Sequence, residues 1–207
     1  MNNIIDNIIG YCNITSPSFL INYIYYNLLN KSVNYMKFIV CTYLPVIILL
    51  FINITKGYMQ ERIGRKNESV KLENNIKDGM NDKFITVFDK SLNAAITNSL
   101  KLCGYIVIFS CVSALICSFF NNGIITCIIC GFIEITNGLY MTSCYMENDS
   151  LKYIILMSIN AWGGVSTLMQ TIGIVGSDNL NIKKYIYQKL MLTLLTLVIS
   201  SIMIYVL

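Results

Sequence analysis

The chain has 207 residues, of which 55% are hydrophobic and only 13% are charged, and its mean hydropathy is +0.60. Soluble domains carry roughly 25% charged residues, so this composition indicates a membrane protein. The sequence contains no histidine, which removes the commonest general base and the commonest metal ligand. With a formal charge of only +4, the composition argues against a soluble enzyme and against a nucleic-acid partner.

Charged residues gather in one segment of the chain, because 14 of the 26 lie between Lys56 and Lys90. We interpret this segment as a solvated, partly helical connection between membrane-embedded parts. The sequence has no glycine-rich phosphate-binding loop. It therefore predicts neither catalytic residues nor ATP-driven chemistry, and we expect no cofactor.

The first apolar part of the chain predicts one interrupted helix and one plain span. Residues 7–30 are uncharged but rich in asparagine, and Pro17 follows several polar residues. Because lipid cannot hydrogen-bond a broken backbone, we expect a helix interrupted near Pro17. The 18 uncharged residues between Lys37 and Lys56 are enough for a span, since about 17 to 25 residues cross the hydrocarbon core.

The uncharged run 102–133 is too long for one span and has a turn signal at 121–123. We therefore expect a span from about Ser91 to Phe120. A re-entrant hairpin over 124–145 should follow, with glycines near its centre to unwind the backbone.

Two further elements complete the chain. The uncharged run 153–177 contains glycines and polar residues in its middle, which predicts a second broken helix. The last 18 residues, 190–207, predict a terminal span. The sequence thus predicts an all-α polytopic membrane protein with about five spanning helices plus a re-entrant hairpin.

The distribution of basic residues predicts the orientation. If the hairpin enters and leaves on one side, 12 of the 15 basic residues share a face, which the positive-inside rule places in the cytoplasm. This count includes Lys183, Lys184 and Lys189. Each broken helix followed by a plain span would then be related to the other by inversion, as in inverted-repeat transporters.

Glu134 is the only acidic residue inside an apolar element and is the first candidate binding residue. A carboxylate at the bilayer centre costs at least about 2.5 to 3.5 kcal/mol unless it is paired, protonated or hydrated. Its neighbours Thr136 and Asn137 would coordinate a cation or bind a polar solute, because we expect the backbone between Gly131 and Gly138 to be unwound. The alternatives are a hairpin tip in water and a structural pair with a lysine such as Lys101 or Lys152.

The broken helices supply the other candidates, because an interrupted helix presents free amides and carbonyls at mid-membrane. The alternative is close helix packing through small residues. The candidate solute- or ion-binding residues in these helices are Gly163, Gly164, Ser166 and Gln170 in the second and Asn13, Thr15 and Ser16 in the first.

The eight cysteines lie almost entirely in apolar runs, so we expect small packing residues and no disulfide framework. Cys127 and Cys130 form a CxxC pair. A zinc site would need a second pair or histidines, so packing is the favoured reading and no metal site is expected.

Four stretches carry a family resemblance: CNITSPSF at 12–19, the segment 91–116, GFIEITNGL at 131–139 and WGGVSTLMQ at 162–170. In this order they resemble the YlbJ family of sporulation integral membrane proteins, built from nucleoside-recognition (Gate) domains. The third stretch resembles the family's Gly-x-x-Glu-Ile-Thr-x-Gly hairpin, and the fourth its Gly-x-Ser-x-x-x-Gln segment. Family members often have a histidine where this chain has Leu168.

The resemblance implies a fold similar to that of concentrative nucleoside transporters, with a solute held between hairpins and broken helices. It assigns 1–55 to the end of a first Gate repeat, 56–90 to a polar cytoplasmic connection and 91–207 to a second repeat. It further implies a role in endospore formation, in the bacterial cell or forespore membrane. The implied solute is dipicolinic acid, another small polar anion or a nucleoside-like molecule.

Family members are longer and have another hairpin in their first half, so we expect this chain to correspond to the C-terminal half of such a protein. The expected partners are the lipid bilayer, a small polar solute, and either a separately encoded first half or further copies of the chain. The alternative function is a non-transporting membrane scaffold, or a diverged fragment that acts in assembly or interaction.

Overall fold

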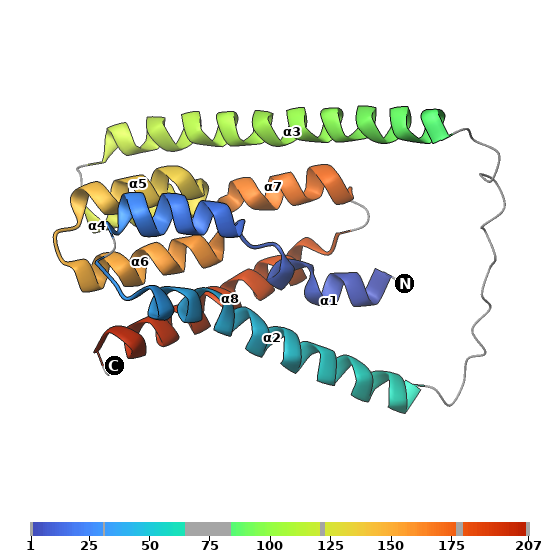
Figure 1. Ribbon diagram of the computed structural model, residues 1–207, viewed down its shortest axis with the longest axis horizontal. Coiled ribbons are helices and arrows are strands. Elements are labelled where there is room, and N and C mark those ends of the chain that lie inside the picture. Colours follow the sequence, from blue (N-terminus) through green and yellow to red (C-terminus); the bar gives the residue numbers. More distant parts are fainter. Residues whose placement is uncertain (1, 31, 65–83, 121–122, 177–179, 206–207) are drawn as a thin grey trace.

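The computed structural model describes residues 2–30, 32–64, 84–120, 123–176 and 180–205, and every element in these ranges is helical (Figure 1). The elements are α1 (Asn2–Cys12), the π-helix η1 (Phe19–Leu28), α2 (Tyr35–Gly64), α3 (Phe84–Phe119), α4 (Ile124–Ile133), α5 (Ile135–Tyr145), α6 (Asp149–Trp162), α7 (Gly164–Val175) and α8 (Ile182–Tyr205). The predicted all-α class is confirmed.

Three of the described helices are long and apolar enough to cross a membrane. They are Tyr35–Thr55 within α2, Phe84–Phe119 in α3 and Ile182–Ile204 in α8. The compact part of the fold lies on one side of α3, where η1, α2, α5, α6 and α8 bury a shared apolar core. Phe38, Tyr153 and Leu156 are fully buried there.

The predicted interruption near Pro17 is present. Helix α1 ends at Cys12, residues 13–16 are not helical, and helical structure resumes at Pro17. Proline suits the first turn of a helix because it has no N–H to leave unpaired. The Ser16 hydroxyl accepts a hydrogen bond from the N–H of Phe19 at 3.2 Å and so caps this new start.

The second predicted interruption is also present, between α6 and α7. Gly163 and Gly164 both have φ = +82°, a left-handed conformation that glycine adopts without steric penalty. The two helices are therefore separate elements with glycines at their junction, as the run of small and polar residues predicts.

Helices α4 and α5 form a hairpin that turns at Glu134, whose backbone is extended (φ −144°, ψ 127°). Gly131 and Gly138 face one another across the hairpin, where a Cβ on Gly138 would lie 2.5 Å from the backbone nitrogen of Gly131. The predicted unwinding between Gly131 and Gly138 is confined to Glu134, and the other residues of this stretch are helical. The two glycines permit close approach of the helices.

The two interrupted helices run in opposite directions. In Figure 1, α1 and η1 run from right to left, and α6 and α7 run from left to right. The helices that follow them, α2 and α8, are likewise opposed. Both ends of the α4–α5 hairpin lie at the left-hand end of this view.

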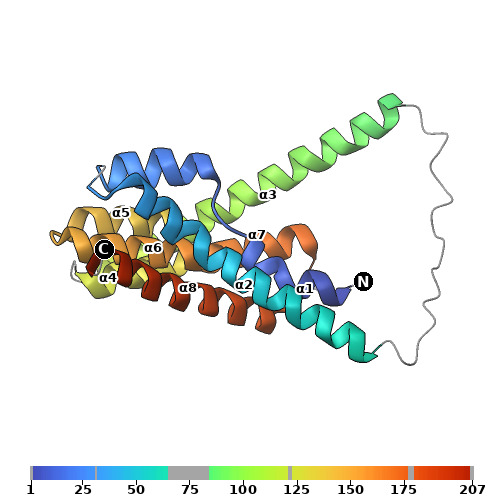
Figure 2. The ribbon, with the colours of Figure 1, turned by 60° about the horizontal axis from the view of Figure 1, so that its bottom comes forward.

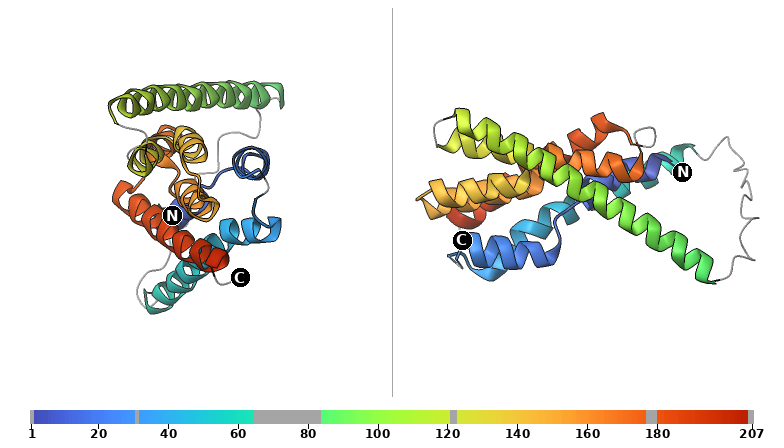
Figure 3. Two further views of the ribbon diagram at one scale, coloured as in Figure 1. Left: turned by 90° about the vertical axis from the view of Figure 1, so that its left-hand side faces the viewer. Right: turned by 90° about the horizontal axis from the view of Figure 1, so that it is seen from above.

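Helix α3 lies along one edge of the helical assembly (Figure 1). It crosses over the other helices at an angle (Figure 3), and its N-terminal half splays away from them (Figure 2). In its most apolar stretch of 18 residues, only 6% of the residues are buried. It begins at Phe84, earlier than the predicted Ser91, and α2 continues to Gly64, so the predicted connection over 56–90 is helical at both ends. Residues 65–83 lie outside the described part.

Candidate functional site

The tip of the α4–α5 hairpin lies against the junction of α6 and α7. A Cβ on Gly164 would lie 3.0 Å from the carbonyl oxygen of Ile133 and 3.2 Å from Cα of Glu134, so glycine permits this contact. Beside it, the indole N–H of Trp162 donates to the carbonyl of Phe132 at 3.1 Å. The two rings stack with centroids 5.0 Å apart.

The break at 13–16 lies against both sides of the same junction. The Thr15 hydroxyl donates to Oδ1 of Asn160 in α6 at 2.8 Å. The Asn13 side-chain amide donates to Oγ1 of Thr171 in α7, also at 2.8 Å. The structure thus brings together three interruptions from distant parts of the sequence: the hairpin tip, the Gly163–Gly164 junction and the break at 13–16.

Glu134 is buried, with 1% of its surface exposed, and its carboxylate caps helix α5. Oε1 accepts from the N–H of Thr136 at 3.1 Å. Oε2 accepts from the Thr136 hydroxyl at 2.5 Å and from the N–H of Asn137 at 2.8 Å. Donors from the first turn of a helix suit an ionised carboxylate. The predicted binding residue is therefore fully hydrogen-bonded within its own hairpin.

The neighbours of Glu134 are arranged differently from the sequence-based alternatives. Lys152 pairs with Asp149 at 3.5 Å, and Lys101 is exposed on α3, so neither pairs with Glu134. The Asn137 side chain donates to the carbonyl and hydroxyl oxygens of Ser110 in α3, each at 3.1 Å. Asn137 therefore attaches the hairpin to α3.

Of the remaining predicted residues, Gly163, Ser166 and Gln170 lie together at the α6–α7 junction and in α7, whereas Ser16 lies apart from them. Ser166 is fully buried one turn into α7, where its hydroxyl accepts from Nε2 of Gln170 at 3.1 Å. Gly163 lies under Thr167, whose hydroxyl donates to its carbonyl at 2.9 Å. Ser16 is exposed and caps its own helix, so it does not join the other candidates.

A cavity of ≈ 390 Å³, open over much of its extent, lies between α1, α3 and α7. Such a volume falls in the range of small-molecule sites, about 300 to 1,000 Å³. Its walls are formed by Ile9, Cys12, Asn13, Leu102, Gln170, Thr171, Ile174 and Val175. The polar groups in this wall are amides and a hydroxyl, and two of them, Asn13 and Gln170, are predicted site residues from different broken helices.

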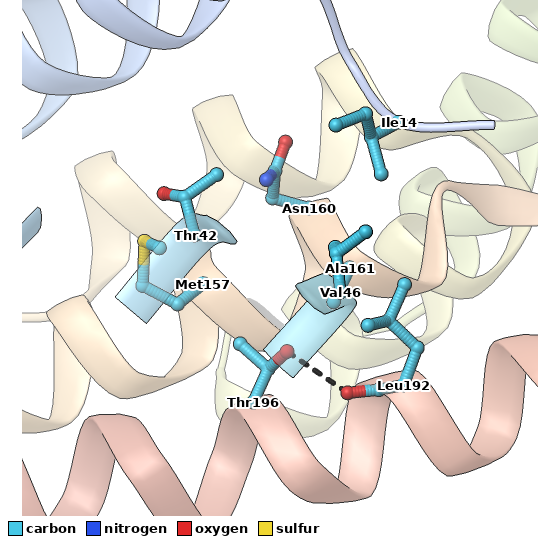
Figure 4. A pocket seen from close by; sticks show the side chains of 8 residues that line it. All are labelled: Ile14, Thr42, Val46, Met157, Asn160, Ala161, Leu192 and Thr196. Carbon is cyan, nitrogen blue, oxygen red and sulfur yellow. Dashed lines mark hydrogen bonds between the residues drawn. The ribbon is translucent and has the colours of Figure 1, made fainter. Parts of the chain in front are cut away.

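A much smaller cavity, of ≈ 10 Å³, lies between α2, α6 and α8 (Figure 4). This is about the room of one water molecule. Asn160 faces it together with Thr42 and Thr196, whose hydroxyls donate to carbonyls of their own helices at 2.9 Å and 2.8 Å. The core behind the first break is thus close-packed, and the larger cavity is the one with room for a solute.

The sequence-based count treats Lys189 as a charge of the loop that precedes the terminal span, and this prediction is wrong. Lys189 is 2% exposed and lies inside α8, where its amine donates to the carbonyl of Asn13. Asn160, Thr171 and Tyr185 also bind the break or its neighbours and were not among the candidates. Pairing between α8 and α1 depends on tertiary packing, so no local pattern marks these residues.

The expectation that all cysteines serve only packing is also wrong. Cys117 of α3 and Cys130 of α4 form a disulfide, whereas Cys127 is free and buried. The bond joins the hairpin to α3 near the Asn137–Ser110 contact. Among the residues that the structure describes, no three Cys, Asp or Glu side chains gather as metal ligands would.

Comparison with known proteins gives no relative: no family model, no curated protein and no solved structure matches the chain.

Proposed function

We propose that this chain is part of a membrane transporter for a small polar solute, built like the second half of a Gate-domain protein. The observation that carries the proposal is the convergence of the hairpin tip at Glu134, the Gly163–Gly164 junction and the break at 13–16. At membrane depth, interrupted backbone is tolerated only where protein buries it or where it lines a wet cavity. Here the break at 13–16 contributes Asn13 to the wall of the cavity of ≈ 390 Å³, and interrupted backbone beside such a cavity is typical of transporter sites.

The proposed arrangement in the membrane has α2, α3 and α8 as plain spans. The pairs α1–η1 and α6–α7 are two broken spans, and α4–α5 is a re-entrant hairpin. The length of α4 supports this, because 10 residues extend about 15 Å, half of the hydrocarbon core. The opposed directions of the two broken helices (Figure 1) support an inverted repeat.

The candidate solutes are dipicolinic acid, another small polar anion or a nucleoside-like molecule. The resemblance to YlbJ-like proteins supports the first, and it supports a location in a bacterial cell or forespore membrane during endospore formation. The uncharged wall groups Asn13, Gln170 and Thr171 support a solute that is held by hydrogen bonds. A separately encoded first half, or another copy of the chain, is the proposed protein partner.

The proposed topology makes a direct prediction. Cysteine labelling or reporter fusions will place residues 60–85 and residues 180–188 on the same, cytoplasmic side of the membrane, because the hairpin returns to the side from which it enters. Labels on opposite sides would mean that 124–145 crosses fully, which would exclude the inverted repeat.

The cavity wall makes a second prediction. In cells that also express a first half of a Gate-domain protein, Gln170→Leu will lower accumulation of labelled dipicolinic acid or nucleosides roughly tenfold at unchanged abundance. The reason is that a lost hydrogen bond to a polar solute is worth about 1 to 1.5 kcal/mol. Asn93→Leu, the same kind of change at an exposed position of α3, is the control. Wild-type accumulation in the Gln170 variant would exclude the cavity as the solute site.

A second candidate function is a non-transporting membrane scaffold. The hydrogen-bonded state of Glu134 favours it, because the carboxylate caps α5 and is not among the residues that line the ≈ 390 Å³ cavity. A scaffold would use the glycines and amides for helix packing alone. Absence of accumulation for every solute tested, with normal abundance of both halves, would support this function and contradict transport.

A further inference from the structure

A buried lysine lies within the polar contacts that α8 makes with α1. Lys189 is 2% exposed and belongs to the apolar stretch Ile182–Ile204. An ammonium group in such a stretch is unfavourable unless polar partners lie beside it. Within the described part of the chain, no carboxylate lies within ion-pair distance of this amine. Within that part, the partner of the amine is a neutral group.

This partner is the end of helix α1. The Lys189 amine donates to the backbone carbonyl of Asn13, the residue that follows Cys12 at the end of α1. The last carbonyls of a helix have no partner within it and carry a partial negative charge. The ammonium group therefore stabilises this helix end and holds the start of the break against α8.

Asn13 connects this contact to the cavity. Its side-chain amide donates to Oγ1 of Thr171 and to the hydroxyl of Tyr185, each at 2.8 Å, and it forms part of the ≈ 390 Å³ cavity wall. Lys189 is not one of the wall residues. It therefore acts on the wall through the backbone of Asn13.

We propose that Lys189 is a positioning residue of the solute site, whose ammonium fixes the break at 13–16 so that Asn13 faces the cavity. This inference rests on the proposed function of the cavity. Among the described residues, Lys189 is the one buried charge beside the break, and it orients the wall without contacting the solute.

Two neighbouring contacts separate this role from simple attachment of α1. The Lys184 amine donates to Oδ1 of Asn7, and Oε1 of Gln188 accepts from the N–H of Gly10 at 2.9 Å. Both contacts hold the body of α1, whereas Lys189 holds its end. Attachment of α1 as a whole would therefore depend on Lys184 as much as on Lys189.

The test is amide hydrogen exchange of the purified full-length chain in lipid nanodiscs, measured by mass spectrometry on peptides covering 10–20 and 155–175. The amides of Asn13 and Ile14, bonded to carbonyls at 3.1 Å and 3.0 Å, report the break. In Lys189→Met their exchange will be about tenfold faster, since loss of a charged contact at a helix end shifts local opening by about that factor. Lys189→Arg keeps the charge and will restore the wild-type rate.

Two lysine variants on the same helix are the matched controls. Lys183→Met removes a charge from an exposed position, and Lys184→Met removes a contact to the body of α1. Both will leave exchange at the break unchanged. An equal rise in Lys184→Met would overturn the assignment, as would wild-type exchange in Lys189→Met or failure of the arginine variant to restore it.

Two further outcomes are decisive. Faster exchange of the peptide 155–175 in Lys189→Met would show a general stabilising role and overturn a positioning role. Because exchange is measured without any solute, its result does not depend on whether the chain transports. Solute accumulation in the same variants tests the proposed function separately, and there Lys189→Met is expected to raise KM while Lys189→Arg keeps it.

Discussion

Replacement of Gly138 by alanine is expected to force the α4–α5 hairpin apart and to lower the stability of the whole chain. The added Cβ would lie 2.5 Å from the backbone nitrogen of Gly131 and 3.2 Å from the carbonyl carbon of Cys130. Both are backbone atoms, so no side chain can turn aside to make room. One of the two helices must shift as a body.

Two opposing effects set the size of this change. Overpacking of a close contact costs about 1 to 3 kcal/mol or more, and a backbone clash belongs at the upper end. Alanine also favours a helix over glycine by about 1 kcal/mol. The clash wins, and the net loss of about 2 kcal/mol should lower the melting temperature by roughly 4 to 8 °C for a chain of this length.

The measurement is thermal unfolding in detergent together with maleimide labelling of Cys127, a free and buried thiol on α4. Labelling of Cys127 should become faster in Gly138→Ala as the helices separate. Gly104→Ala is the matched control, because nothing lies within 4 Å of a Cβ at that position of α3. It should be neutral or stabilising. A Gly138 variant with wild-type melting and a protected Cys127 would contradict the close contact.

The sequence is informative about where the helices are interrupted, and the reason is the membrane. A proline after polar residues, or adjacent glycines inside an apolar run, would leave backbone groups unpaired in lipid. Such residues therefore mark two interruptions, one at Pro17 and one at Gly163 and Gly164, and these two lie together in the fold. Similarly, Glu134 between two glycines marks the turn of the hairpin.

The sequence is much less informative about what binds these interruptions. Lys189 is followed by 18 uncharged residues, so it looks like the last charge of a loop. Its position inside α8 becomes evident only when α1 packs against it. The Cys117–Cys130 bond likewise depends on how α3 lies beside α4. Local composition predicts where helices are interrupted, and contacts between helices decide which residues bind the interruptions.

Glu134→Gln is expected to lower both the abundance and the thermal stability of the chain. Both carboxylate oxygens accept hydrogen bonds from the first turn of α5, from the N–H groups of Thr136 and Asn137 and from the Thr136 hydroxyl. Glutamine has one acceptor oxygen, and its amide N–H groups would face other donors. An unsatisfied buried donor costs about 1 to 3 kcal/mol, and loss of the negative charge at the helix start adds to this.

Removal of the buried charge of Glu134 would by itself stabilise the chain, because a carboxylate in a membrane interior is unfavourable. Here three donors at 2.5 to 3.1 Å already compensate that charge, so the loss of the cap outweighs the gain. Glu134→Asp decides between the two roles. Aspartate is a good capping residue and should keep abundance near wild type, although its shorter side chain would withdraw from any solute or ion.

The experiment measures abundance, melting temperature and solute accumulation side by side, in cells that also supply a first half. Asn148→Ala removes a cap from the exposed start of α6, where Asn148 accepts from the N–H of Leu151 at 3.0 Å. Water can replace that cap, so its effect should be smaller. Normal abundance with lost accumulation in both Glu134 variants would show that the carboxylate binds the solute or its coupling ion. If instead the carboxylate holds the hairpin tip in the shape that meets Gly164, Glu134→Gln will lose abundance and Glu134→Asp will keep it.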